Sequence, residues 1–92
     1  MSPNTTMAKV KIYSTPYCSY CRMAKSFFTE KKVLFDEVDV SVDQAAAEEM
    51  IKKTNQMGVP VIEIGEDTVV GFDRATLEKI LAKNAGLIET TA

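Results

Sequence analysis

The chain of 92 residues is long enough for one folded domain with a modest hydrophobic core. Its net charge of −2 gives no basic surface of the kind that binds nucleic acid, and no apolar run approaches the roughly 20 residues of a membrane-spanning helix. The first residues lack both the basic region and the apolar core of a secretory signal. We therefore expect a cytoplasmic monomer with one domain over residues 1–92, a flexible leader at 1–7, a flexible tail at 86–92, and neither nucleic-acid nor membrane partners.

The first half of the chain is predicted to form a strand, a helix and a second strand. Residues 9–14 alternate charged and apolar side chains, which is typical of a strand. Residues 19–32 repeat apolar side chains at helical spacing with basic residues opposite, which predicts an amphipathic helix. Residues 34–40 alternate in a way that places their apolar side chains on one side of an extended chain, which predicts a second strand. A strand–helix–strand unit of this kind pairs its strands in parallel through a right-handed crossover. The inward side of the second strand is expected to carry Leu34, Val38 and Val40.

The second half is predicted to form a helix, a hairpin and a last helix. Asp43 can cap a helix that runs to about residue 54. Residues 61–64 and 68–70 are short β runs joined by a tight loop, which predicts an antiparallel hairpin. Asp73 can cap the final helix. The apolar positions expected to face inward from the two helices are Ala45, Ala46, Met50, Ile51, Leu77, Ile80 and Leu81.

The only two cysteines, Cys18 and Cys21, have C-x-x-C spacing at the junction between the first strand and the first helix. A C-x-x-C beside a β-α-β pattern indicates a thioredoxin-like redox pair. Thiol–disulfide exchange requires a thiolate, and the unpaired N–H groups at a helix start favour one at Cys18. Arg22 adds a smaller, salt-screened positive potential. Cys21 follows one turn later, where we expect more burial and a higher pKa. Cys18 is thus predicted to attack a disulfide, and Cys21 to resolve the mixed disulfide.

The two cysteines and Pro60 also allow simpler interpretations. A structural zinc site needs four Cys or His ligands, which a monomer with two cysteines and no histidine cannot supply, so no metal site is expected. Two unrelated buried cysteines at this spacing have roughly a one-in-ten chance. Pro60 is by default a trans proline at the first residue of an edge strand, because only about 5–6% of X-Pro bonds in folded proteins are cis.

Three stretches together resemble the glutaredoxins, over most of the chain from about residue 9 to 83. They are Y-S-T-P-Y-C-S-Y-C, which contains the two cysteines, G-V-P-V-I-E-I around the proline, and V-V-G-F-D-R-A-T-L before the last helix. The resemblance implies an α/β, thioredoxin-like fold with a four-stranded mixed sheet flanked by three helices. It also implies thiol–disulfide oxidoreductase activity.

The resemblance further assigns residues that bind glutathione or a disulfide substrate. It implies that Pro60 is cis, against the base rate. The backbone of Val59 would pair with the extended peptide of glutathione or substrate. Asp73 would contact the γ-glutamyl end of glutathione, and Tyr20 corresponds to the aromatic residue between the cysteines.

The sequence also departs from the usual glutaredoxin pattern. Ser19 replaces the proline after the first cysteine, Thr15 stands where a lysine often binds the glutathione carboxylate, and Gly58 replaces a threonine. Loss of the lysine removes one charge-assisted contact, typically worth ~1.5–3 kcal/mol. The residues that could replace its charge are Lys52, Lys53 and Arg74.

We expect a dithiol oxidoreductase that reduces protein disulfides or glutathione mixed disulfides, without a tightly bound cofactor and with glutathione as a possible co-substrate. Two alternatives stay open by resemblance. One is a dimer that holds a [2Fe–2S] cluster with glutathione, which Ser19 permits. The other is a dedicated electron donor, for example to ribonucleotide reductase, reduced by thioredoxin reductase. A rim for such a protein contact would comprise Tyr17, Tyr20, Met57, Val59 and Phe72.

Overall fold

A computed structural model describes residues 10–84 of the chain. The leader and tail predicted at 1–7 and 86–92 lie outside these residues. In chain order the elements are β1 (Val10–Ser14), α1 (Ser19–Glu30), β2 (Phe35–Asp39), α2 (Gln44–Thr54), β3 (Val61–Ile64), β4 (Asp67–Val70) and α3 (Arg74–Lys83). Within the described part of the chain, no helix is long and apolar enough to cross a membrane.

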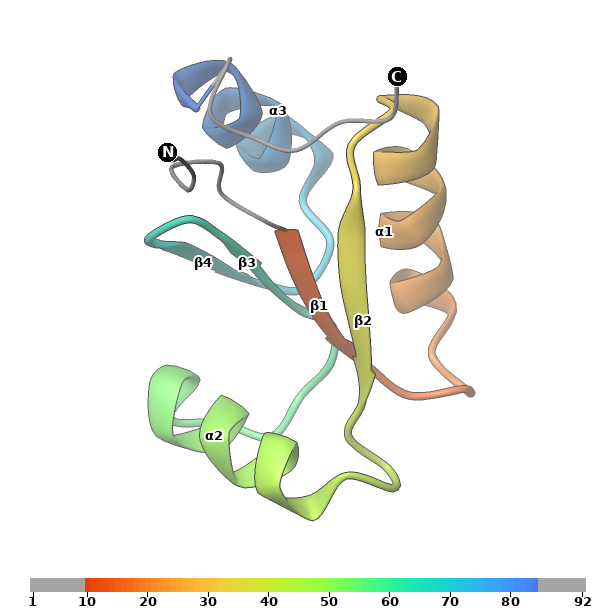
Figure 1. Cartoon of the computed structure of the whole chain (residues 1–92), viewed down its shortest axis with the longest axis vertical. Helices are drawn as coiled ribbons and strands as arrows, with labels where there is room; N and C mark the ends of the chain where they lie inside the picture. The colour runs from red at the N-terminus through yellow and green to blue at the C-terminus, as the bar shows by residue number, and fades with distance from the viewer. Residues whose placement is uncertain (1–9, 85–92) are drawn as a thin grey trace, which may run out of the picture.

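The four strands form one mixed sheet in the order β2-β1-β3-β4. β1 runs parallel to β2 and antiparallel to β3, and β4 pairs antiparallel with β3. The predicted parallel β-α-β unit and the predicted hairpin are both confirmed. Figure 1 shows α1 and α3 on one face of the sheet and α2 alone on the other. This is the predicted α/β, thioredoxin-like arrangement of a four-stranded sheet and three helices.

The two faces of the sheet carry two separate cores, because successive residues of a strand point to opposite faces. On β1, Ile12 belongs to the larger core with α1 and α3, whereas Tyr13 belongs to the smaller core with Met50 of α2. The larger core contains the buried residues Val10, Ile12, Ala24, Phe27, Phe28, Val33, Ile62, Ile64, Val69 and Leu77. The face covered by α1 and α3 therefore holds most of the buried apolar volume.

Two of the predicted inward positions are wrong. Leu34 is 43% exposed, while its neighbour Phe35 packs against the larger core. β2 is an edge strand with helices over both faces, so the apolar residues in and next to it divide between the two cores: Val38, and Val40 just after the strand, pack against the smaller one. Ala45 is also exposed, because it lies on the outer side of α2. The predicted first helix ends at Glu30 rather than at residue 32.

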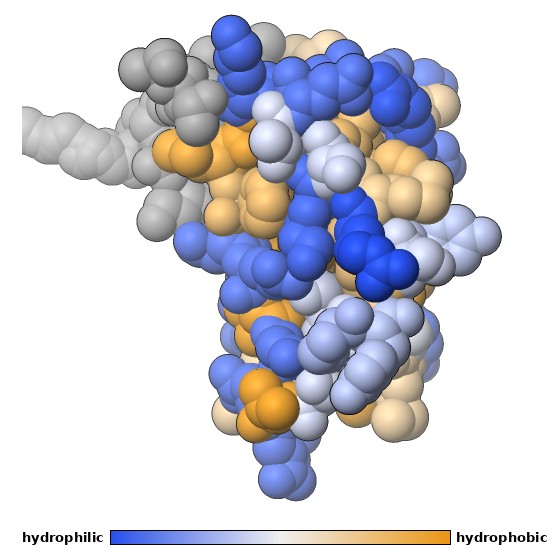
Figure 2. Space-filling model, turned by 90° about the vertical axis from the view of Figure 1, so that its right-hand side faces the viewer, coloured by the Kyte–Doolittle hydropathy of each residue, from blue (hydrophilic) through white to orange (hydrophobic). Residues whose placement is uncertain are grey.

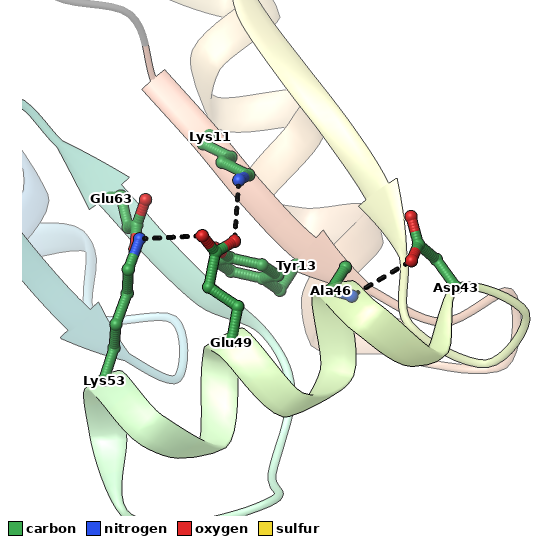
Figure 3. A network of polar contacts seen from close by, with 7 residues as sticks. All are labelled: Lys11, Tyr13, Asp43, Ala46, Glu49, Lys53 and Glu63. Carbon is green, nitrogen blue, oxygen red and sulfur yellow. Dashed lines mark hydrogen bonds and ion pairs between the residues drawn. The ribbon is translucent and has the colours of Figure 1, made fainter.

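A polar network fixes α2 on its face of the sheet (Figure 3). The buried Tyr13 donates its hydroxyl to Glu49 at 2.8 Å, and Lys11 donates to the same carboxylate at 3.3 Å. Lys53 lies 2.8 Å from Glu63 and 3.9 Å from Glu49. The Tyr13 hydrogen bond, followed by that of Lys11, lowers the pKa of Glu49. The smaller core thus ends in charged groups that bridge α2 to β1 and β3.

Candidate redox-active site

Cys18 caps the N-terminus of α1. Its backbone is extended, and its sulfur accepts a hydrogen bond from the backbone N–H of Cys21 at 3.0 Å. The turn that leads into the helix is closed by a hydrogen bond from the Cys18 N–H to the Thr15 carbonyl at 3.3 Å. A capping position leaves the first N–H groups of a helix without backbone partners, and the Cys18 sulfur takes one of them. The prediction that Cys18 lies at the helix start is confirmed.

Cys21 lies inside the first turn of α1 and is fully buried, whereas Cys18 is half-buried. Burial, followed by its hydrogen bond with the Cys18 sulfur, raises the pKa of Cys21 to about 12. The backbone N–H of Thr15 and the positive charge of Lys25 oppose this increase. Both cysteines are free thiols. The predicted contrast in burial, with a raised pKa at the second cysteine, is therefore present.

The loop before β3 reaches the Cys18 sulfur. The Val59–Pro60 peptide bond is cis, as the resemblance implied and contrary to the base rate for X-Pro bonds. The Cys18 thiol donates toward the Val59 carbonyl oxygen, with 3.8 Å between sulfur and oxygen. Pro60 is buried. Val59 and Pro60 are thus brought directly beside the half-buried thiol.

The turn between β4 and α3 is attached to the same proline loop. Gly71 donates its N–H to the Pro60 carbonyl at 2.7 Å with φ +87°, a conformation that favours glycine. Asp73 then caps α3: its carboxylate accepts from the Thr76 N–H at 3.3 Å and from the Thr76 hydroxyl at 2.9 Å. These bonds, the hydroxyl first, lower the pKa of Asp73. The predicted cap is confirmed, and both carboxylate oxygens are used for it.

The sequence did not predict one side chain that shapes the loop before Pro60. Gln56 accepts from the Gly58 N–H at 2.6 Å and donates to the Gly58 carbonyl at 3.1 Å, so its amide clamps the residue just before Val59. A Cβ added at Gly58 would lie 2.7 Å from the Gln56 amide oxygen. Gly58, which replaces the threonine usual in glutaredoxins, therefore leaves the space that the Gln56 amide occupies. A glutamine two residues before a glycine was the only signal, and its meaning depends on the loop geometry.

Comparison with known proteins agrees with this geometry. The glutaredoxin family model matches residues 10–69. The chain belongs to the glutaredoxin family. It is 40% identical over 74 residues to an uncharacterized glutaredoxin-like 8.6 kDa protein in the rubredoxin operon of Clostridium pasteurianum, covering 80% of this chain and 99% of that protein.

A second relative supports the family, and a solved structure supports the fold. Glutaredoxin 3 of Escherichia coli K12 is 39% identical over 67 residues, which cover 73% of this chain and 81% of that protein. The crystal structure of a glutaredoxin from Archaeoglobus fulgidus superposes with a TM-score of 0.74 at 21% identity, over 82% of this chain and 87% of that one. The thioredoxin-like fold is thus shared with solved glutaredoxins.

The aromatic residue between the cysteines of this glutaredoxin faces solvent. Tyr20 is 60% exposed, and Tyr17 on the other side of Cys18 is 89% exposed. The sequence left open whether Tyr20 packs or faces a substrate. Its exposure leaves the ring accessible beside the thiols. Met57, in the loop before the cis proline, is 77% exposed.

Two of the cations suggested as replacements for the missing glutaredoxin lysine are already engaged. Lys53 is paired with Glu63, and Arg74 lies 3.2 Å from Glu78 and 3.6 Å from Glu30. Lys52 is exposed on α2 and makes no ion pair with another residue of the 10–84 range. Exposed ion pairs exchange readily, so pairing alone does not remove these charges from a ligand's reach.

Proposed function

We propose that this glutaredoxin is a dithiol thiol–disulfide oxidoreductase that reduces protein disulfides or glutathione mixed disulfides. The observation that carries the proposal is the contrast at the first turn of α1. Cys18 is half-buried, at the helix N-terminus, with an N–H donated to its sulfur, whereas Cys21 is fully buried with a raised pKa. The thiolate is the nucleophile in thiol–disulfide exchange, and of the two thiols it is the half-buried Cys18 that a substrate can reach.

The reaction takes place in two exchange steps. The Cys18 thiolate attacks one sulfur of the substrate disulfide, a Cys18–substrate bond forms, and the other substrate sulfur leaves as a thiolate that takes a proton from water. Cys21 then loses its proton and attacks the Cys18 sulfur. The substrate leaves as its second thiolate, and the chain is left with a Cys18–Cys21 disulfide. Two electrons have passed from the dithiol to the substrate.

The substrate is proposed to lie against the cis-proline loop. The Val59 backbone is next to the Cys18 sulfur, and Pro60 fixes its direction. An extended chain that pairs with the Val59 backbone would be held within reach of the thiolate. The exposed Tyr20 ring would cover that chain from the other side. Asp73, at the start of α3, would receive the γ-glutamyl group when the substrate is a glutathione mixed disulfide.

The reaction needs the two sulfurs of the chain and an external reductant, so no tightly bound cofactor is proposed. The reductant is either glutathione or thioredoxin reductase. The test supplies each separately, with its NADPH-linked partners, and follows reduction of an insulin disulfide and of a glutathione mixed disulfide. We expect one or both reductants to sustain turnover by the wild-type chain.

Two variants assign the steps. Cys18→Ser should abolish turnover with either reductant, because the attacking sulfur is gone. Cys21→Ser, mixed with substrate and no reductant, should accumulate a mixed disulfide on Cys18 that mass spectrometry detects. Full turnover by the Cys18→Ser variant would end the proposal.

A further inference from the structure

A groove runs along α1 on the side that faces the start of α3, from the residue after Cys18 toward the end of the helix. The loop before α3 forms its second wall. The groove has a volume of about 430 Å³. It is lined by Ser19, Arg22, Met23, Ser26, Phe27, Glu30, Phe72 and Arg74. The proposed catalytic steps use none of these residues.

Of the two arginines that line the groove, only Arg22 has no side-chain partner among residues 10–84. Arg74, on the α3 side, lies 3.6 Å from Glu30 and 3.2 Å from Glu78, and its guanidinium also lies over the Phe27 ring at 5.1 Å. Arg22 is exposed and makes no hydrogen bond or ion pair through its side chain with another residue of the described range 10–84. The uncompensated guanidinium is therefore the one nearer to the redox pair.

Arg22 is also tied closely to Cys18 along the chain. Its backbone N–H donates to the Cys18 carbonyl at 3.3 Å, so it lies one helical turn beyond the thiol. One turn advances about 5.4 Å, and an extended peptide covers about 7 Å in two residues. A side chain two or three residues from a captured cysteine would therefore be level with the guanidinium.

The remaining surface of the groove suits a mixed polar and apolar peptide. Phe72 is half-buried and Met23 is 49% exposed, and both lie among polar neighbours. Figure 2, which views the molecule from the α1 side, shows hydrophilic and hydrophobic side chains interspersed on this face. Scattered apolar side chains around a charged group are typical of the outer part of a transient protein contact.

We propose that this groove binds the segment of a protein disulfide substrate that flanks its cysteine on one side, with an acidic side chain of that segment paired to Arg22. The proposal rests on the proposed function, because the segment is delivered when Cys18 attacks the substrate. The stretch of α1 from Ser19 to Glu30 is about 16 Å long, which matches about five extended residues. Glutathione has one residue on each side of its cysteine and is too short to follow it.

The test uses the Cys21→Ser chain, in which the adduct on Cys18 accumulates. Symmetrical disulfides of short cysteine peptides are compared: a parent with neutral flanks and six peptides with a single glutamate at positions −3 to +3 from the cysteine. Cys18 attacks either equivalent sulfur, one peptide is retained, and the other leaves as a thiol. At low salt we expect faster adduct formation for glutamate two or three residues away on one side only, by about three- to fivefold.

Arg22→Gln should remove this preference, so that the glutamate peptides react at the same rate as the neutral peptide, and 0.5 M salt should weaken the preference in the chain that retains Arg22. Lys52→Gln is the matched control, because it removes an exposed charge of the same sign from α2. A preference that survives Arg22→Gln, or that Lys52→Gln reduces equally, overturns the proposal. So does an equal effect of glutamate on both sides of the cysteine.

A further experiment measures the rate at which glutathione disulfide forms an adduct on Cys18 in the same variants. We expect Arg22→Gln to change its rate no more than the rate of the neutral peptide, and a loss as large as that of the acidic peptide would assign Arg22 to glutathione instead. If no peptide forms an adduct on Cys18, it is the proposed function that fails. If all peptides react at one rate, the function stands and the groove proposal fails.

Discussion

Cys18 and Cys21 occupy the two ends of a single helical turn. Cys18 stands outside the helix, half-buried, and its sulfur takes the N–H of Cys21. Cys21 is inside the helix, where its side chain turns toward the sheet and is fully buried with a raised pKa. The difference comes from position, because a cap residue faces unpaired amides and a residue three places later faces the core. Two identical thiols are thereby given different chemistry.

The largest expected difference between Cys18 and Cys21 is in their rates of alkylation. In the native protein at pH 7, iodoacetamide should label Cys18 at least about a hundred times faster than Cys21, because the buried thiol reacts only when the structure opens. In 8 M urea the two rates should become similar. Peptide mapping by mass spectrometry measures both, and equal native rates would contradict the difference in burial.

The pH dependence of stability should reveal the raised pKa of Cys21. Folding favours the protonated thiol, whose pKa is about 12 when folded and near the free-cysteine value of ~8.5 when unfolded. This contribution is fully present below pH ~8.5 and is lost as the pH rises toward 12, with a slope that approaches about 1.4 kcal/mol per pH unit.

Urea unfolding of the wild type and of Cys21→Ala from pH 7 to 10.5 measures how much Cys21 contributes to the change of the unfolding free energy with pH. The variant retains the titration of the tyrosines and lysines, so the wild type should lose stability more steeply above pH ~9. Parallel curves for the two proteins would show that Cys21 is not held protonated by the fold.

A smaller effect is expected from Lys25, whose charge opposes the raised pKa of Cys21. Lys25→Met should slow the second exchange step at pH 7 by about two- to fivefold and move its pH profile upward. Rapid quenching of the mixed disulfide measures this step. Lys53→Met is the matched control, because Lys25 and Lys53 each pair with a strand glutamate at 2.8 Å. Equal slowing by both variants would rule out a specific action on Cys21.

Local patterns in the sequence were enough for most of the fold. Alternation, helical spacing and the caps Asp43 and Asp73 predicted all seven elements and the β1–β2 and β3–β4 pairings, but not the antiparallel pairing of β1 with β3. The C-x-x-C at a strand-to-helix junction predicted that Cys18 would lie at the helix start and that Cys21 would be more buried; the structure adds that Cys18 is the N-cap. The cis bond before Pro60 came from the family resemblance alone, because base rates favour the trans form.

The features that were not predicted depend on contacts between distant or irregular segments. The apolar residues of β2 divide between two cores because it is an edge strand with helices on both sides, so Leu34 was placed wrongly. The Gln56 clamp on Gly58 exists only in the bent loop. Sequence could not predict that the Arg22 side chain has no partner among residues 10–84, whereas Arg74 pairs with Glu30 and Glu78. Local patterns in the amino-acid sequence contain no information about these contacts.

The most direct test of the central claim, that Cys18 captures the substrate and Cys21 releases it, is to identify the cysteine that carries the substrate during a single turnover. Wild-type dithiol is mixed with one equivalent of a protein disulfide, quenched with acid at successive times, digested and mapped by mass spectrometry. The account predicts a transient adduct on Cys18 that decays at the rate at which the Cys18–Cys21 disulfide appears. An adduct on Cys21, or one on Cys18 that persists while no internal disulfide forms, would contradict it.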